Sequence, residues 1–160
     1  MGITVIGITH PEQVGVLPGG TNVIVLADDG THSDHFLDTD FGAHQLVVRA
    51  FGHGSAFFAV ADKARELGAS RVLFGGFREL ATEEDPVLVF DSPGLIAFNA
   101  PFAERMSGWA RPASAYRDGL KTWLTTHAVR AGLRVVAAGT QAPWNPLRTD
   151  EVPMRRKLTA

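Results

Sequence analysis

Short runs of apolar and β-branched residues recur along the chain, and each one predicts a buried strand. Such runs, apolar at every position rather than alternating, are typical of strands that are covered on both faces of a sheet. Glycine, proline or aspartate residues punctuate most of them, as expected where strands end in turns. The predicted strands are Ile3–Ile8, Asn22–Ala27, Gln45–Ala50, Arg71–Phe74, Val87–Phe90 and Leu133–Ala138.

Two segments show apolar residues at helical spacing instead. In Ser55–Leu67 an apolar stripe recurs every three or four positions, and Gly68 provides a stop signal. A second helix is predicted over Ala115–Ala131. The apolar segment Leu95–Phe102 is interrupted by Asn99 and by a proline, so we interpret it as a loop over the functional site.

The order of these elements predicts an α/β fold. The strand at 45–50, a glycine-rich break, the helix at 55–67 and the strand at 71–74 form a βαβ unit, whose two strands are normally parallel and neighbouring. The remaining strands complete a mixed, largely parallel central sheet of about six strands flanked by helices. A chain of 160 residues is expected to form one domain, spanning residues 1–160.

The functional site is expected where ligands bind in such sheets, outside the carboxyl ends of the strands. There the sequence places hydroxyl, imidazole and guanidinium groups together with glycines, which suit an anion such as phosphate. The alternative interpretation is ordinary turn polarity and surface charge. The predicted binding residues of this kind are Thr9, His10, Arg49, Gly75, Gly76 and Arg78.

Candidate catalytic and stacking residues lie beside these groups. His53 is a candidate general acid or ribose partner, or alternatively a structural helix cap, and Asp91 and Asn99 form a polar pair near a strand end. Aromatic rings can stack on a planar ligand, although they are also common core residues. The predicted stacking residues are Phe77, Phe98 and Trp144, and Phe102 is a further candidate.

The segment Thr31–His44 concentrates histidines and aspartates, and it has two interpretations. Imidazole and carboxylate groups are ligands of several divalent metals, but no helical metal-ligand spacing is present. The alternative is a solvated loop or sheet edge. We therefore predict no metal site.

Composition narrows the classes of partner. The formal net charge is −2, with 45% hydrophobic and 20% charged residues, which predicts neither a nucleic-acid partner nor a membrane partner. No cysteine is present, so thiolate chemistry is excluded. The start of the sequence does not resemble a secretory signal, and a cytoplasmic location is expected.

The serial order of the motifs resembles the nucleoside phosphorylase superfamily, especially the trimeric purine nucleoside and methylthioadenosine phosphorylases. Gly7–His10 stands in place of a GGSG-like phosphate loop, and Arg49–His53 in place of the R-H-G-x-G-H motif. Leu67–Leu73 matches an L-G-V-x-x-V-L strand. The segments that resemble later motifs are Gly75–Leu80, Val87–Asp91 with Leu95–Asn99, Tyr116–Leu120, Ala138–Gln141 and Asn145–Asp150.

This chain also departs from the family pattern. The phosphate motif is broken at Ala50-Phe51, Arg148 and Thr149 replace the base-holding pair, and the sequence stops where the family continues, as in a carboxyl-terminally truncated form. The resemblance implies a divergent nucleoside phosphorylase or hydrolase that acts on a nucleoside or related small polar metabolite, with phosphate as a co-substrate and no other cofactor.

Two alternatives remain open. The first is a non-catalytic relative of the family that binds a nucleoside-like ligand or pairs with another subunit. The second is an unrelated flavodoxin-like domain. An uncovered sheet edge or face predicts a homo-oligomer.

Overall fold

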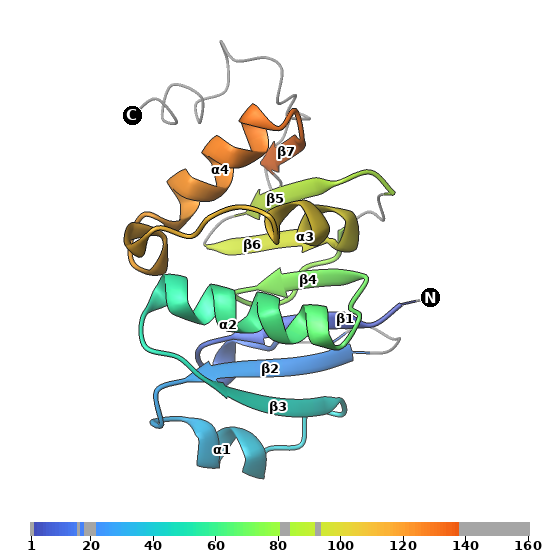
Figure 1. Ribbon diagram of the computed structural model, residues 1–160. Helices are drawn as coiled ribbons and strands as arrows, with labels where there is room; N and C mark the ends of the chain where they lie inside the picture. The colour runs from blue at the N-terminus through green and yellow to red at the C-terminus, as the bar shows by residue number, and fades with distance from the viewer. Residues whose placement is uncertain (1, 16, 18–21, 81–83, 92–93, 138–160) are drawn as a thin grey trace.

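The computed structural model describes residues 2–15, 17, 22–80, 84–91 and 94–137. Within these ranges seven strands form one sheet in the order β3-β2-β1-β4-β6-β5-β7 (Figure 1). The strands are β1 Thr4–Ile8, β2 Asn22–Asp28, β3 His44–Arg49, β4 Arg71–Phe74, β5 Val87–Asp91, β6 Leu95–Asn99 and β7 Arg134–Ala137. The helices are α1 Ser33–Asp38, α2 His53–Glu66, α3 Ala100–Met106 and α4 Leu120–Arg130, with 3₁₀ turns η1 Pro11–Gln13 and η2 Ala113–Tyr116.

The sheet is mixed and largely parallel, which confirms the predicted fold class. Strands β1 to β4 run parallel to one another, and β5 and β7 are parallel neighbours. Strand β6 is antiparallel to both of its neighbours, β4 and β5. The predicted loop over residues 95–102 is therefore wrong, because this segment is strand β6 followed by the start of α3.

The predicted βαβ unit exists, but its strands are not neighbours. Helix α2 crosses in front of β2 and β1, so that β3 lies at the edge of the sheet and β4 lies on the far side of β1 (Figure 1). Strands β3 and β4 are nevertheless parallel to each other. Strand β3 pairs with β2 (Val23↔His44), β4 pairs with β1 (Thr4↔Arg71), and β1 and β2 are themselves parallel. As a result the carboxyl ends of β3 and β4 are separated by two strands.

Apolar side chains bury both faces of the sheet, as the continuous apolar runs predict. Val5 and Val23 point into the larger core on the side covered by α2, α3 and α4 (Figure 1). Ile6 and Ile24 point to the opposite side, where Phe36 of α1 packs against them. Because successive side chains of a strand alternate between faces, one apolar run supplies both cores.

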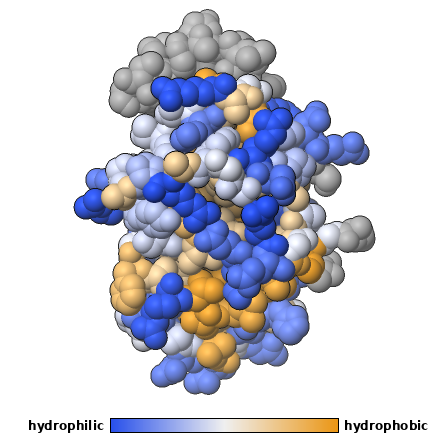
Figure 2. Space-filling view, viewed as in Figure 1, coloured by the Kyte–Doolittle hydropathy of each residue, from blue (hydrophilic) through white to orange (hydrophobic). Residues whose placement is uncertain are grey.

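The edge strand β3 is less completely covered than the central strands. Val47 and the following Phe51 are among the exposed large hydrophobic residues, with 37% and 66% of their surface accessible. A space-filling view shows apolar residues gathered on this face of the molecule (Figure 2).

No helix in the described part of the chain has the length and apolarity that a membrane crossing requires.

Candidate functional site

A crevice opens where the chain leaves β1 and β4 in opposite directions. The Gly75 amide donates a hydrogen bond to the Gly7 carbonyl over 2.8 Å, and this bond joins the ends of the two strands. Beyond it, the chain after β1 forms η1 and proceeds to β2, whereas the chain after β4 leads toward the other half of the sheet (Figure 1). Such a switch point at the carboxyl edge of a sheet is the place where ligands bind in α/β folds.

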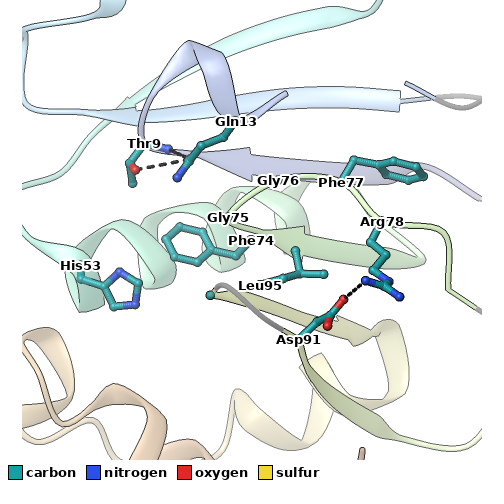
Figure 3. A pocket seen from close by; sticks show the side chains of 11 residues that line it. Thr9, Gln13, His53, Phe74, Gly75, Gly76, Phe77, Arg78, Asp91 and Leu95 are labelled. Atoms are coloured by element: carbon teal, nitrogen blue, oxygen red, sulfur yellow. Dashed lines mark hydrogen bonds and ion pairs between the residues drawn. The ribbon is translucent and has the colours of Figure 1, made fainter. Parts of the chain in front are cut away.

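The crevice contains a cavity of about 630 Å³, a size that suits a small organic ligand. Its lining comes from the ends of β1, β4 and β5, the start of β6 and the start of α2 (Figure 3). The lining residues are Thr9, Gln13, His53, Phe74, Gly75, Gly76, Phe77, Arg78, Asp91, Gly94 and Leu95.

Gly75 and Gly76 form a wall of this cavity that has no room for side chains. Their φ angles are 105° and 142°, a region that residues with a Cβ rarely adopt. A Cβ at Gly75 would lie 3.0 Å from the Gly94 carbonyl oxygen, and one at Gly76 would lie 3.0 Å from the Gln13 carbonyl oxygen. The backbone itself therefore lines this part of the cavity.

Arg78 and Asp91 form an ion pair at one end of the same cavity (Figure 3). The distance between Arg78 Nη1 and Asp91 Oδ2 is 2.6 Å. The Asp91 side chain is only 2% exposed, while that of Arg78 is 48% exposed. The buried carboxylate thus holds a guanidinium whose other donors are accessible from the cavity.

A second cavity of about 270 Å³ continues from the first along the same edge of the sheet. Thr9 and His53 line both cavities, so we treat the two as one groove. The remaining residues of the smaller cavity are His10, Ala27, Asp28, Asp29, His32, Ala50, Gly52 and Ala56.

Two carboxylates give this second end of the groove an acidic character. Asp28 is 2% exposed, and both of its carboxylate oxygens accept from the His32 amide at 3.0 and 3.1 Å. Asp29 is exposed and accepts from the Thr31 hydroxyl at 2.6 Å and from the Thr31 amide at 3.1 Å. The Thr31 hydroxyl, with smaller contributions from its amide, lowers the pKa of the Asp29 carboxyl, because these bonds favour the ionised form.

Two histidines bridge the ends of β1 and β2 above these carboxylates. His10 Nδ1 lies 3.0 Å from His32 Nε2, and the two rings meet edge to face. Gln13 supports the same loop from within, since its Oε1 accepts from the Thr9 amide at 2.8 Å. The loop that carries Thr9 and His10 is therefore held in a defined shape.

The groove brings together most of the residues predicted from the sequence. Thr9, His10, His53, Gly75, Gly76, Phe77, Arg78 and Asp91 all line it. His53 is the first residue of α2, and its ring lies against Phe74, with 5.5 Å between the ring centroids. Trp144 lies outside the described residues.

Three predicted site residues lie elsewhere. Arg49 ends the edge strand β3 and lines neither cavity, and β2 and β1 separate it from β4. The prediction that Arg49 and Arg78 meet is therefore wrong. Phe98 is 2% exposed and packs in the core beside Phe57, so it is not a stacking surface of the groove.

Asn99 is placed at the opposite edge of the sheet. Because β6 runs antiparallel to β4, its last residue pairs with Arg71, the first residue of β4. The Asn99 Oδ1 accepts from the Val87 and Phe102 amides at 3.1 and 3.2 Å, and its Nδ2 donates to the Asp85 carbonyl at 2.7 Å. Asn99 caps α3 and fixes the start of β5, and the predicted pairing with Asp91 at one site is wrong.

Sequence reasoning missed four polar residues of the groove, which are Gln13, Asp28, Asp29 and His32. The two aspartates follow the second apolar run directly, a signal that we interpreted only as a turn. The position of this run beside β1 makes its carboxyl end part of the groove. Knowledge of the strand order was needed to find these residues.

Comparison with known proteins identifies the fold but no family. No protein-family model and no curated protein match the sequence. A candidate nucleotide-diphospho-sugar transferase of known structure from Desulfovibrio desulfuricans G20 is similar with a TM-score of 0.50 and 11% identity, over 84% of this chain and 78% of that one.

Two further solved structures align over more of the chain but with lower scores. They are Rv0371c from Mycobacterium tuberculosis H37Rv and its homolog from Mycobacterium sp. strain JC1, with 12% and 10% identity and a TM-score of 0.45 each. The alignments cover 99% and 98% of this chain, and 98% and 96% of those chains.

The resemblance to nucleoside phosphorylases is wrong. The similarity in fold is to the nucleotide-diphospho-sugar transferase structure, and the sequence motifs that suggested a phosphorylase were each short. Glycine-rich turns after apolar strands are common to many α/β folds, so their serial order did not distinguish between two of them. The similarity to that structure concerns the fold alone.

Proposed function

We propose that the groove binds a nucleotide of the nucleoside diphosphate or nucleotide-sugar class, and that the protein is a transferase acting on such a ligand. The observation that carries this proposal is the groove at the switch point, with a cationic end at Arg78 and an acidic end at Asp28 and Asp29. The similarity in fold to a candidate nucleotide-diphospho-sugar transferase supports the same ligand class.

The charges of the groove set the direction of the ligand. Phosphate groups are favoured near Arg78, where a guanidinium donates to phosphate oxygens, and are disfavoured near the carboxylates of Asp28 and Asp29. The amino-terminal end of α2 begins with His53 between the two cavities and adds positive potential there. The hydrogen-bond donors on the ribose and base of the ligand then face the carboxylates of Asp28 and Asp29.

His53 is the residue that we propose for proton transfer. It is exposed, it lines both cavities, and its ring is positioned against Phe74. In a transfer reaction the bond between the sugar and the diphosphate breaks, the nucleoside diphosphate leaves, and an acceptor hydroxyl forms the new bond. His53 would accept the proton of that hydroxyl.

The test is a binding measurement followed by a turnover measurement. Isothermal titration with UDP, GDP, CDP, ADP and dTDP, each beside its nucleoside, should show that the diphosphate binds more tightly than the nucleoside. Release of the diphosphate from the matching nucleotide sugar then measures turnover. His53→Ala should abolish turnover, and His44→Ala is the control, since His44 begins β3 at the opposite edge of the sheet.

A non-catalytic binding protein is the second candidate. The observation that favours it concerns Asp91, the carboxylate of the larger cavity, which is buried and paired with Arg78. Asp91 is therefore not available for proton transfer, and that step would depend on His53. Tight binding without release of the diphosphate from any nucleotide sugar would favour this candidate. Absence of binding by all five diphosphates would refute the proposed function as a whole.

A further inference from the structure

We propose that Arg78, held by the buried Asp91, binds the phosphate groups of the diphosphate through its remaining N–H donors, so that this protein binds its ligand without a divalent metal ion. The inference rests on the proposed function and adds to it how the phosphate groups are held. Proteins hold a diphosphate either with Mg²⁺ bound to one or two carboxylates or with cationic side chains. The residues of the groove distinguish between these two solutions.

The described residues directly after β4 that line the cavity provide no carboxylate for a metal ion. They are Gly75, Gly76, Phe77 and Arg78, none of which has a side-chain oxygen. The two glycines have positive φ angles, and a Cβ at either one would lie 3.0 Å from a backbone oxygen. An acidic side chain at these positions would therefore strain the loop.

The carboxylate that does line the larger cavity is already paired. Asp91 Oδ2 lies 2.6 Å from Arg78 Nη1, and its side chain is 2% exposed. A metal ion bound to Asp91 would have to displace the guanidinium from a buried partner or lie beside its positive charge, and both are unfavourable. In the described residues no cluster of three or more histidine, aspartate or glutamate side chains is arranged to hold a metal ion.

The carboxylates of the smaller cavity accept hydrogen bonds from the protein. Asp28 accepts the His32 amide with both oxygens, and Asp29 accepts the hydroxyl and the amide of Thr31. They also line the smaller cavity only, whereas Arg78 and Asp91 line the larger one.

Arg78 has the geometry of a phosphate ligand. A guanidinium carries five N–H donors in a planar fork and binds phosphate through two parallel hydrogen bonds. Asp91 engages Nη1, and nearly half of the Arg78 side chain is accessible. Figure 3 shows the pair at the end of the cavity away from His53, so a diphosphate would lie between the two groups.

The test compares nucleoside diphosphate binding to the wild-type protein in EDTA with binding in MgCl₂ or MnCl₂. We expect the Kd of the best-binding diphosphate to be the same in all three solutions, within about twofold, which is a small difference in free energy. Binding that appears only with a metal ion would overturn this inference and leave the proposed function intact. Failure of every diphosphate in all three solutions would overturn both.

Two variants test the role of Arg78 itself in EDTA. Arg78→Gln should raise the Kd about 10-fold or more, because it removes a charge-assisted hydrogen bond to phosphate. Arg105→Gln is the control, because this exposed arginine lies on α3 and lines neither cavity. An unchanged Kd in Arg78→Gln would overturn the inference, and circular dichroism confirms that both variants are folded.

Discussion

The imidazoles of His10 and His32 contact each other across the ends of β1 and β2, with 3.0 Å between Nδ1 and Nε2. The pair joins two loops that line the smaller cavity, and neither loop is fixed by the strands alone. In this contact one ring nitrogen donates and the other accepts. This contact is the basis of the first prediction.

His32→Ala should weaken nucleotide binding while changing stability little. Loss of the ring frees His10 and removes one wall of the smaller cavity, so we expect the Kd to rise about threefold to tenfold, equivalent to about 1 kcal/mol. Isothermal titration measures this change. His35→Ala is the control, since His35 is exposed on α1 and lines neither cavity. Equal affinities of the two variants would contradict the prediction.

Asn99→Ala should destabilise the fold without affecting the groove. The variant leaves the Val87 and Phe102 amides without their acceptor and removes the cap of α3, so we expect a loss of about 2–3 kcal/mol in the free energy of unfolding. Urea denaturation measures the loss.

Ser107→Ala is the matched control for Asn99. Its exposed hydroxyl donates to the Glu104 carbonyl, and the change should stay within about 0.5 kcal/mol. A stable Asn99→Ala protein with weakened nucleotide binding would instead place Asn99 in the site.

Thr31→Val should raise the pKa of the Asp29 carboxyl toward its ordinary value. The hydroxyl of Thr31 is the main cause of the lowered pKa, while the amide of residue 31 remains as a weaker donor. A titration of the Asp29 carboxyl carbon by NMR measures the change. Thr39→Val is the control, because the Thr39 hydroxyl donates to the His35 carbonyl. An unchanged titration in Thr31→Val would contradict the prediction.

The sign of the pH dependence follows from this shift. Because the pKa of Asp29 is lower in the folded than in the unfolded protein, its ionisation favours folding. This contribution is present above the unfolded pKa and is lost as the pH falls through the folded value. In Thr31→Val the corresponding loss should begin at the same pH but end closer to the ordinary aspartate pKa, so the total loss of stability in acid becomes smaller.

Gly54→Ala should destabilise the protein although alanine is the better helix former. Gly54 lies in the first turn of α2, where a Cβ would meet the Ala115 carbonyl oxygen and lie 2.7 Å from Tyr116 Cα. The clash is with backbone atoms of η2, so we expect a loss of about 1–3 kcal/mol. Thermal unfolding measures the loss.

Ser55→Ala is the matched control in the same turn. We expect its melting temperature to be at or above that of the wild type, because alanine has the higher helix propensity. An unchanged melting temperature in Gly54→Ala would show that η2 moves away from α2 without cost.

Local pattern in the sequence was sufficient for α2 and for six of the seven strands in the described residues, whereas β6 was predicted as a loop. The runs at β1, β2, β4 and β5 are apolar throughout, and each was predicted within about two residues, which is the usual uncertainty of element ends. The positions that line the groove from β1, α2 and β4 were predicted from strand ends, because the carboxyl edge of a parallel sheet is set by strand direction alone.

The order and direction of the strands were decided by tertiary structure. The crossover of α2 places β3 at the edge and so separates Arg49 from Arg78, and the reversal of β6 moves Asn99 to the far edge. Both outcomes depend on hydrogen bonds between residues distant in sequence, for which a local pattern carries no signal. The sequence by itself determined six of the seven described strands and where polar groups follow them, whereas only the pairing of the strands determined which polar groups share one groove.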